Sequence, residues 1–163
     1  MKKILIFGGI SSGKSKIAEE MTLQIAKTKP YYIATYLDEF SDKQMKEKIL
    51  KHQKQREEKF INIEEPYDIA KPIEPNKTFI VDCLSMLIFN NLEHEERLFS
   101  QLWSISTCRA NIVFVLNDVS CGIIASQKQS RKFVELSGKV GQMVAEFCDE
   151  VYEVKFGLKK RLK

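Results

Sequence analysis

A glycine-rich segment near the N-terminus has the residue types and spacing of a phosphate-binding loop. It follows an apolar run, Ile4 to Phe7, fits the pattern G-x-x-x-x-G-K-S and precedes a stretch with helical spacing of its apolar residues. Glycines let the backbone turn tightly and bring successive N–H groups to phosphate oxygens, and the start of the following helix favours the same anions. The chain is therefore predicted to bind a nucleoside triphosphate. The residues expected to contact it here are Gly8, Gly9, Ile10, Ser11, Ser12, Gly13, Lys14 and Ser15.

Three side chains have the chemistry to act on the phosphates. Lys14 supplies a mobile positive charge for catalysis, and the Ser15 hydroxyl is a ligand for the Mg²⁺ ion that accompanies GTP or ATP. Asp82 ends the apolar run Phe79–Asp82, as expected of a carboxylate that reaches the same ion directly or through water. Asp82 could also be the N-cap of a following helix, and the two roles are compatible. The sequence thus predicts a metal site made by Ser15 and Asp82.

Short apolar or β-branched runs alternate with longer amphipathic stretches along the chain, a pattern typical of a parallel sheet covered by helices. We expect an α/β fold of the P-loop NTPase (RecA-like) type, a mostly parallel sheet with helices on both faces, in a single domain over residues 1–163. The expected strands are Ile4–Phe7, Tyr31–Thr35, Phe60–Ile63, Phe79–Asp82, Ile112–Leu116 and Val151–Val154. The expected helices are Ser15–Lys27, Glu39–Lys59, Leu84–Arg109 with a break near Asn90-Asn91, and a segment with Phe133, Leu136, Val140, Met143, Val144 and Phe147 on one stripe.

Ligands of open parallel sheets bind beyond the carboxyl ends of the strands. Besides the glycine-rich segment and Asp82, this position is taken by Thr35 and Tyr36 after the second strand, and by Asn117 and Asp118 after a later one. Turn residues are common at strand ends. A functional and a structural role therefore both stay open for Asn117 and Asp118.

His52 lies in a basic stretch of the chain. Between Lys43 and Lys59 there are seven Lys or Arg residues and three Glu. Nearby cations disfavour the imidazolium form, so His52 would be neutral and nucleophilic near neutral pH while its surroundings attract phosphate. The residues alone nevertheless favour a solvated surface histidine. His94 has acidic neighbours, and we expect it to be a solvated surface residue as well.

Composition narrows the class of protein. The net charge is +4, and the basic residues are not interleaved with aromatic ones, so anionic small molecules rather than nucleic acids are the expected partners. We expect a cytoplasmic protein with no membrane span, because no apolar stretch is long enough to be one and the N-terminal run is too short for a signal peptide. The cysteines are far apart, and we expect reduced thiols rather than a zinc site. They are Cys83, Cys108, Cys121 and Cys148.

Taken together, these segments resemble the bifunctional adenosylcobinamide kinase/adenosylcobinamide-phosphate guanylyltransferase family of cobalamin biosynthesis. The resemblance runs nearly end to end and rests on the order and spacing of its motifs. They are Gly-Gly-x-x-Ser-Gly-Lys-Ser at Gly8–Ser15, Tyr-Ile-Ala-Thr at Tyr32–Thr35, Lys48, Ile49, His52 and Arg56, Glu64-Glu65-Pro66, Asp82-Cys83-Leu84, Asn90-Asn91-Leu92, then Asn117, Gly122, Arg131, Phe133, Gly138 and Gln142, and a short basic tail with Gly157 and Arg161.

The resemblance implies a two-step enzyme. The first step transfers the γ-phosphoryl group of a nucleoside triphosphate to the hydroxyl of adenosylcobinamide. The second joins GMP from GTP to that phosphate through a GMP-histidine intermediate, and His52 matches the histidine. The resemblance also implies a homo-oligomer, a trimer. Beyond the glycine-rich segment, the implied nucleotide-binding residues are Ala34, Thr35, Tyr36, Gln53, Lys54, Gln55, Arg56, Glu64 and Asp82.

The chain departs from the family pattern at several positions. It has Ser11 where the family commonly has Arg in the loop, which removes a phosphate contact, and Gly141 where the family has Asn. The other departures are Asp118-Val119-Ser120 in place of Glu-Val-Gly and Ala125-Ser126 in place of Pro-Glu. Two other interpretations stay open: a small-molecule kinase with a single activity, in which His52 is idle, and a nucleotide-binding regulatory module without turnover.

Overall fold

The computed structural model describes residues 1–37, 58–119 and 127–163. Strands and helices alternate along the chain, as expected. Their bounds are β1 (Lys3–Gly8), α1 (Lys14–Ile25), β2 (Tyr31–Ala34), β3 (Ile61–Glu64), β4 (Thr78–Asp82), α3 (Leu84–Asn90), α4 (Glu95–Thr107), β5 (Asn111–Asn117), α5 (Lys128–Phe147), β6 (Glu150–Lys155) and β7 (Leu158–Arg161).

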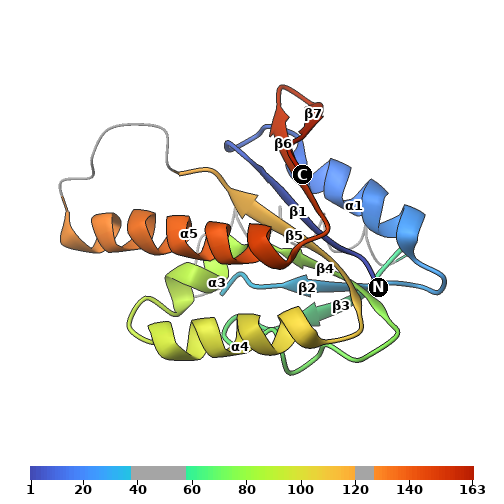
Figure 1. Ribbon diagram of the computed structural model, residues 1–163, viewed down its shortest axis with the longest axis horizontal. Helices are drawn as coiled ribbons and strands as arrows, with labels where there is room; N and C mark the ends of the chain where they lie inside the picture. The colour runs from blue at the N-terminus through green and yellow to red at the C-terminus, as the bar shows by residue number, and fades with distance from the viewer. Residues whose placement is uncertain (38–57, 120–126) are drawn as a thin grey trace.

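The described strands form one seven-stranded sheet in the order β3-β2-β4-β5-β1-β6-β7 (Figure 1). Neighbouring strands from β3 to β6 pair in parallel, and β7 pairs antiparallel with β6. The predicted mostly parallel sheet is therefore confirmed. Because parallel strands end at the same edge, the segments that follow β1, β2, β3, β4 and β5 meet along one edge of the sheet.

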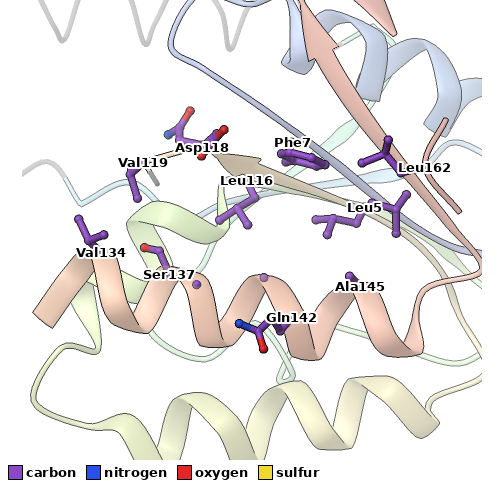
Figure 2. Close-up of a pocket in the computed structure, with 14 residues that line it drawn as sticks. Leu5, Phe7, Leu116, Asp118, Val119, Val134, Ser137, Gln142, Ala145 and Leu162 are labelled. Atoms are coloured by element: carbon purple, nitrogen blue, oxygen red, sulfur yellow. The ribbon is translucent and has the colours of Figure 1, made fainter. Parts of the chain in front are cut away.

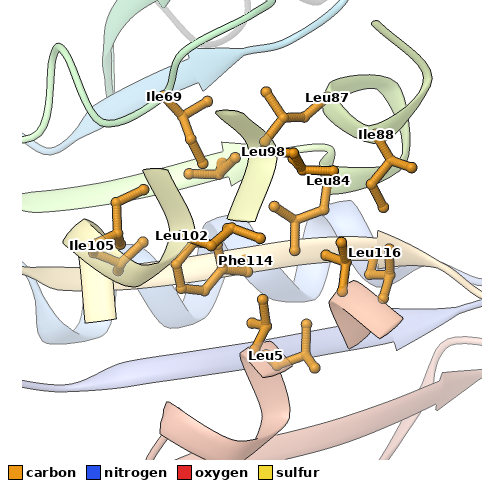
Figure 3. Packing of buried hydrophobic residues seen from close by; sticks show 14 of the residues in the cluster. Leu5, Ile69, Leu84, Leu87, Ile88, Leu98, Leu102, Ile105, Phe114 and Leu116 are labelled. Atoms are coloured by element: carbon orange, nitrogen blue, oxygen red, sulfur yellow. The ribbon is translucent and has the colours of Figure 1, made fainter. Parts of the chain in front are cut away.

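Helices cover both faces of the sheet. Ile4 and Ile6 of β1 pack in a buried cluster with Met21 of α1, whereas Leu5, between them, points to the opposite face. That second face is covered by α3, α4 and α5. Leucines and isoleucines of α3 and α4 lie in one cluster with Phe114 of β5 (Figure 3). Since both faces are buried, the central strands are continuous apolar runs rather than alternating ones.

The six strands expected from the sequence are all present, with bounds within one residue of those predicted. The break near Asn90-Asn91 separates α3 from α4. On α5, Leu136, Val140 and Val144 are buried, and the other three residues of the predicted stripe are partly buried against the same core. The predicted helix Glu39–Lys59 lies outside the described residues except for its last two positions, which form a turn.

The C-terminus differs from the sequence prediction. The basic tail was expected without secondary structure being assigned to it, but Leu158–Arg161 pairs with β6 as the edge strand β7, with Lys155 opposite Leu158 across a two-residue turn. Every residue of β7 is exposed. Across the described ranges, no helix has the length and apolar character needed to cross a membrane.

Candidate functional site

The glycine-rich segment turns tightly between β1 and α1. Gly13, the N-cap of α1, has a φ of 92°, a left-handed conformation that side chains rarely adopt. A Cβ atom on Gly8 would lie 2.2 Å from the carbonyl oxygen of Val154, so glycine alone fits beside β6. Ser11 also has a positive φ, 59°. The local sequence thus specifies both the turn and its close approach to the neighbouring strand.

Two side chains of the segment are buried beneath it. The ammonium group of Lys14 donates to the carbonyl oxygen of Gly9 at 3.2 Å, and Lys14 is 8% exposed. Within the described structure, the buried Oγ of Ser12 has no hydrogen-bond partner. A buried polar group without a partner is costly, and phosphate oxygens are strong acceptors for hydroxyl and ammonium donors. An anion seated in the segment would therefore relieve this cost.

Asp82 lies at the end of β4, and its carboxylate accepts a hydrogen bond from the hydroxyl of Tyr32 on the neighbouring strand β2. Tyr32 is buried and packs edge-on against Phe60, with 5.7 Å between ring centroids. The alternative role of Asp82 as a helix N-cap is wrong, because the N-cap of α3 is Cys83 and no side chain caps that helix. A buried phenol, not a helix end, orients the carboxylate.

Thr35 links the end of β2 to the start of α3. It is fully buried, and its hydroxyl donates to the Cys83 carbonyl at 2.7 Å and accepts from the Cys83 N–H at 3.0 Å. Burial raises the pKa of the Cys83 thiol, and the nearby carboxylate of Asp82 raises it further. The thiol therefore stays protonated and is a poor nucleophile. The neighbouring Ala34 and Tyr36 are half-buried.

Asn90, at the end of α3, holds two of the strand-end loops together. Its side-chain amide donates to the carbonyl oxygens of Thr35 and Pro66, both at 2.9 Å. Glu64, the last residue of β3, is exposed and lies opposite Ala34 of β2. Sequence reasoning assigned Asn90 no contact of this kind. The nearest signal was the predicted break at Asn90-Asn91.

The end of β5 lies beside the glycine-rich segment. Asn117 is opposite Gly8, and the N–H of Asp118 donates to the Gly8 carbonyl at 2.9 Å. The backbone N–H of Asn117 donates to the Oγ of Ser85, on α3, at 2.9 Å. Asn117 and Asp118 thus have contacts that fix the end of β5. These contacts support a structural role, which is one of the two roles that the sequence left open.

The β6–β7 hairpin lies on the other side of the segment (Figure 1). The N–H of Gly157, in its turn, donates to the carbonyl oxygen of Ser12 at 2.8 Å. A Cβ atom on Gly13 would lie 3.3 Å from the Cα of Gly157, which is closer than most side chains allow. Sequence reasoning missed this contact because it did not predict the hairpin.

Ser15, at the start of α1, and Asp82 bring a hydroxyl and a carboxylate to the same edge of the sheet. Hard oxygen ligands of this kind suit Mg²⁺. Within residues 1–37, 58–119 and 127–163, no three His, Cys, Asp or Glu side chains are grouped as a metal site.

Several predicted site residues lie outside the described residues. They include the candidate nucleophile and its neighbours, together with most of the positions between 118 and 126 at which the chain departs from the family pattern. These positions are His52, Gln53, Lys54, Gln55, Arg56, Ser120, Ala125 and Ser126. His94 is exposed at the N-cap of α4, as expected of a surface histidine.

A mostly apolar cavity of about 330 Å³ lies between α5 and the sheet (Figure 2). Leu5 and Phe7 of β1 line it from one side, and Gly138 and Gly141 line it from the helix. Ser137 also lines it, and the buried Oγ of this residue has no hydrogen-bond partner in the described part of the chain. The cavity lies on the face opposite α1, and its described lining includes none of residues 8–15.

The fold is similar to that of the flagellar accessory protein FlaH from Methanocaldococcus jannaschii. The TM-score is 0.55 at 16% identity, over 99% of this chain and 78% of that one. At such low identity the likeness concerns the fold alone. Together with the glycine-rich turn between β1 and α1, it shows the P-loop NTPase fold.

The sequence is similar to curated proteins over almost its whole length. It is 30% identical to the bifunctional adenosylcobalamin biosynthesis protein CobP of Pseudomonas aeruginosa, covering 98% of this chain and 96% of that protein. It is 26% identical to the bifunctional adenosylcobalamin biosynthesis protein CobU of Escherichia coli, covering 98% and 99%. A family model described as cobinamide kinase / cobinamide phosphate guanyltransferase matches residues 4–162. The chain therefore belongs to the cobinamide kinase / cobinamide phosphate guanyltransferase family of bifunctional enzymes.

Proposed function

We propose that the chain phosphorylates the hydroxyl group of adenosylcobinamide and then transfers GMP from GTP to the new phosphate, as a step of cobalamin biosynthesis. One observation carries the proposal. In a chain that matches the family over residues 4–162, buried Lys14, the hydroxyl of Ser15 and the oriented carboxylate of Asp82 lie at the edge of the sheet where the glycine-rich turn is. These are the groups that phosphoryl transfer needs, because its catalysis consists mainly of positioning and charge stabilisation.

In the first step, the backbone N–H groups of the loop and the ammonium of Lys14 hold the phosphates. The substrate alcohol attacks the γ-phosphorus, its proton passes to solvent water, and the bond to the leaving nucleoside diphosphate breaks. Lys14 balances the charge that develops on the leaving phosphate. Ser15 and Asp82 would hold Mg²⁺, whose charge neutralises the phosphate oxygens. Tyr32 keeps the Asp82 carboxylate oriented.

In the second step, His52 is the proposed nucleophile. A neutral imidazole nitrogen attacks the α-phosphorus of GTP, and the bond to pyrophosphate breaks, leaving GMP on the histidine. An oxygen of the substrate phosphate then attacks the same phosphorus and releases the imidazole. The covalent stage splits one difficult displacement into two easier ones. The other proposed nucleotide contacts are Ala34, Thr35, Tyr36, Gln53, Lys54, Gln55, Arg56 and Glu64.

The nucleophile can be tested with its natural control, because the chain has two histidines, His52 and His94. Incubation with Mg²⁺ and α-labelled GTP should leave one GMP per chain, labile in acid and located by peptide mass spectrometry at His52. His52→Ala should lose the label, and His94→Ala should keep it. Label retained by His52→Ala would reject the assignment, and unlabelled wild-type protein would favour a kinase with a single activity.

The phosphoryl transfer can be tested with γ-labelled nucleotide and adenosylcobinamide. Lys14→Ala should lower kcat by 100-fold or more, roughly the loss from removing one charged group that stabilises the transition state. Lys16→Ala, two residues further along α1 and exposed, is the matched control and should keep full activity. Nucleotide binding without any labelled product would instead support a regulatory module.

We propose in addition that the protein is cytoplasmic and that its active form is a homotrimer. Light scattering of the purified chain would check the trimer.

A further inference from the structure

Phe156 is an exposed aromatic residue at the tip of the β6–β7 hairpin. It is 87% exposed, and the next residue, Gly157, donates its N–H to the carbonyl oxygen of Ser12 at 2.8 Å. The ring is thus carried by a turn that touches the phosphate-binding segment. We propose that Phe156 is a stacking platform for the base of the nucleoside triphosphate that donates its γ-phosphoryl group. The inference rests on the phosphoryl transfer proposed above.

The strand order decides on which side of the segment this base must lie. Asp82 ends β4 on one side of β1, whereas β6 and β7 lie on the other side. A triphosphate whose terminal phosphates face Lys14 and Asp82 extends its α-phosphate and nucleoside away from β4. The β6–β7 hairpin is the described element on that side, and its turn contacts the segment directly. Phe156 therefore lies on the path of the nucleoside.

The backbone conformation of the turn indicates that Phe156 does not stabilise the fold. Phe156 has a φ of 54° and Gly157 a φ of 76°, as in the two-residue type I′ turn that favours Asn-Gly. A bulky side chain is unfavourable in this left-handed region. A large apolar residue that is both exposed and unfavourable for its turn is typical of a functional position.

The charges of the hairpin suit the same ligand. The Lys155 ammonium lies 5.6 Å from the centroid of the Phe156 ring, and Lys159 lies at the same distance from the ring of Tyr152. Stacking on a phenyl ring accepts any base, because every base has a π-face. The lysines add attraction for the triphosphate. The platform should therefore strengthen binding of ATP and GTP alike in the kinase step.

The decisive variant is Phe156→Asn, which removes the ring and at the same time supplies the residue that the turn prefers. We expect its melting temperature to rise, because Asn-Gly suits a type I′ turn. We expect its Kd for Mg–ATP, measured by calorimetry, to increase fivefold or more, roughly the lower end of the loss of one base–aromatic stack. A purely structural role of Phe156 cannot produce a more stable protein that binds nucleotide less tightly.

Two controls separate stacking from other effects. Magnesium tripolyphosphate carries the phosphate chain without a base, so its Kd should be the same in wild-type and Phe156→Asn protein. Leu158→Ala removes another exposed apolar side chain of the hairpin, 75% exposed, and should leave the Kd for Mg–ATP unchanged. Phe156→Trp in a Trp103→Phe background, which removes the single native tryptophan, should show fluorescence quenching by Mg–ATP but not by tripolyphosphate.

An unchanged Kd for Mg–ATP in Phe156→Asn would overturn the inference, as would an equal loss of affinity for Mg–ATP and tripolyphosphate. A change of oligomeric size with nucleotide affinity intact would also overturn it, since the ring would then cover another copy of the chain. None of these measurements requires the corrinoid. Phe156-dependent binding of Mg–ATP without product from adenosylcobinamide would contradict the proposed function, whereas the stacking of the nucleotide base on Phe156 would still hold.

Discussion

At the scale of single residues, the orientation of Asp82 is the feature that most depends on the surrounding fold. Its carboxylate accepts a hydrogen bond from Tyr32, whose ring is buried against Phe60. A carboxylate fixed in this way is prepared for a metal ion or a reacting hydroxyl before either arrives. Asp82 is a proposed Mg²⁺ ligand, and outer partners of metal ligands commonly affect activity by about 10- to 100-fold.

Tyr32→Phe tests this orientation, because it removes one hydroxyl and keeps the buried ring. We expect kcat for phosphorylation of adenosylcobinamide to fall about tenfold. The free energy of unfolding should fall by about 1–2 kcal/mol. Tyr31→Phe on the same strand is the control, because its hydroxyl accepts from the Lys77 ammonium at 3.0 Å. Equal kcat values in the two variants would show that Tyr32 does not orient the carboxylate.

The site residues that the sequence predicts most directly are those whose signal is local. Lys14 and Ser15 belong to an eight-residue pattern, and Asp82 ends a buried strand. The hydrogen bond from Tyr32 to Asp82 could not be predicted, since it joins residues 50 positions apart and depends on the register of β2 against β4. The prediction of Asp82 as a possible N-cap was wrong because α3 begins one residue later than that role needs.

At the scale of elements, the short helix α3 ties together the ends of several strands. Asn90 bonds the loops that follow β2 and β3, and Ser85 accepts from the backbone at the end of β5. The loops that would line a nucleotide are therefore fixed to a helix packed on the core. This arrangement limits the movement of those loops.

Asn90→Ala removes the donor shared by the carbonyl oxygens of Thr35 and Pro66. We expect the free energy of unfolding to fall by about 1–3 kcal/mol, the usual cost of leaving buried acceptors unpaired. Urea denaturation measures this loss, and hydrogen exchange should become faster around Thr35. Asn62→Ala, exposed on β3, is the control and should change stability by less than about 0.5 kcal/mol. Equal stability of the two variants would contradict the role given to Asn90.

The glycines of α5 give a second prediction at this scale. A Cβ atom on Gly138 would meet nothing within 4 Å, whereas one on Gly141 would lie 3.3 Å from the Cδ2 of Leu116. Gly138→Ala should therefore stabilise the protein by about 0.5–1 kcal/mol, the helix preference of alanine over glycine. Gly141→Ala should gain less, because Leu116 must move. A larger gain for Gly141→Ala in urea denaturation would contradict this packing.

The elements that the sequence predicted well are those defined by burial. Apolar or β-branched runs located the largely buried strands β1, β2, β4, β5 and β6 to within one residue, and the mostly exposed edge strand β3 was expected as well. β7 was missed because Leu158–Arg161 contains one leucine and three cations, all of them exposed. Its strand conformation comes from pairing across the turn with β6, and lysines of this kind are typical of exposed edge strands. A strand whose residues are all exposed cannot be located from the pattern of apolar residues in the sequence.

At the scale of the whole molecule, Glu150 joins the two ends of the chain. Its carboxylate lies 2.8 Å from the Lys2 ammonium, just before β1, and 3.5 Å from the guanidinium of Arg161 on β7. Tyr152 donates to the other oxygen at 3.1 Å. The side chain of Glu150 is 12% exposed, so these interactions are partly shielded from solvent. We expect residues 1–163 to unfold as one unit. We also expect Glu150 to contribute to the stability of the protein in a pH-dependent way.

Glu150→Gln should lower the free energy of unfolding at neutral pH by about 1 kcal/mol, the upper part of the range for ion pairs near a surface. The hydrogen bond from Lys2, above all, holds the pKa of Glu150 below its ordinary value of 4.5, and Tyr152 acts in the same direction. A carboxyl with a lower pKa in the folded state stabilises the protein at pH values above 4.5 and loses this contribution as the pH falls through the lowered pKa. The difference between wild-type and Glu150→Gln protein should therefore be constant near neutrality and disappear in acid.

Urea denaturation at a series of pH values measures that difference directly. Glu135→Gln is the matched control, because Glu135 also pairs with a lysine, Lys139 at 2.6 Å, but both side chains are exposed on α5. Solvent screens this pair, so its loss should not be measurable at any pH. If the two variants behave alike, the contacts that join Lys2, Glu150 and Arg161 are no stronger than a surface pair. A single transition that shifts with pH in wild-type protein but less in Glu150→Gln would show that the chain ends are coupled to the whole sheet through one carboxylate.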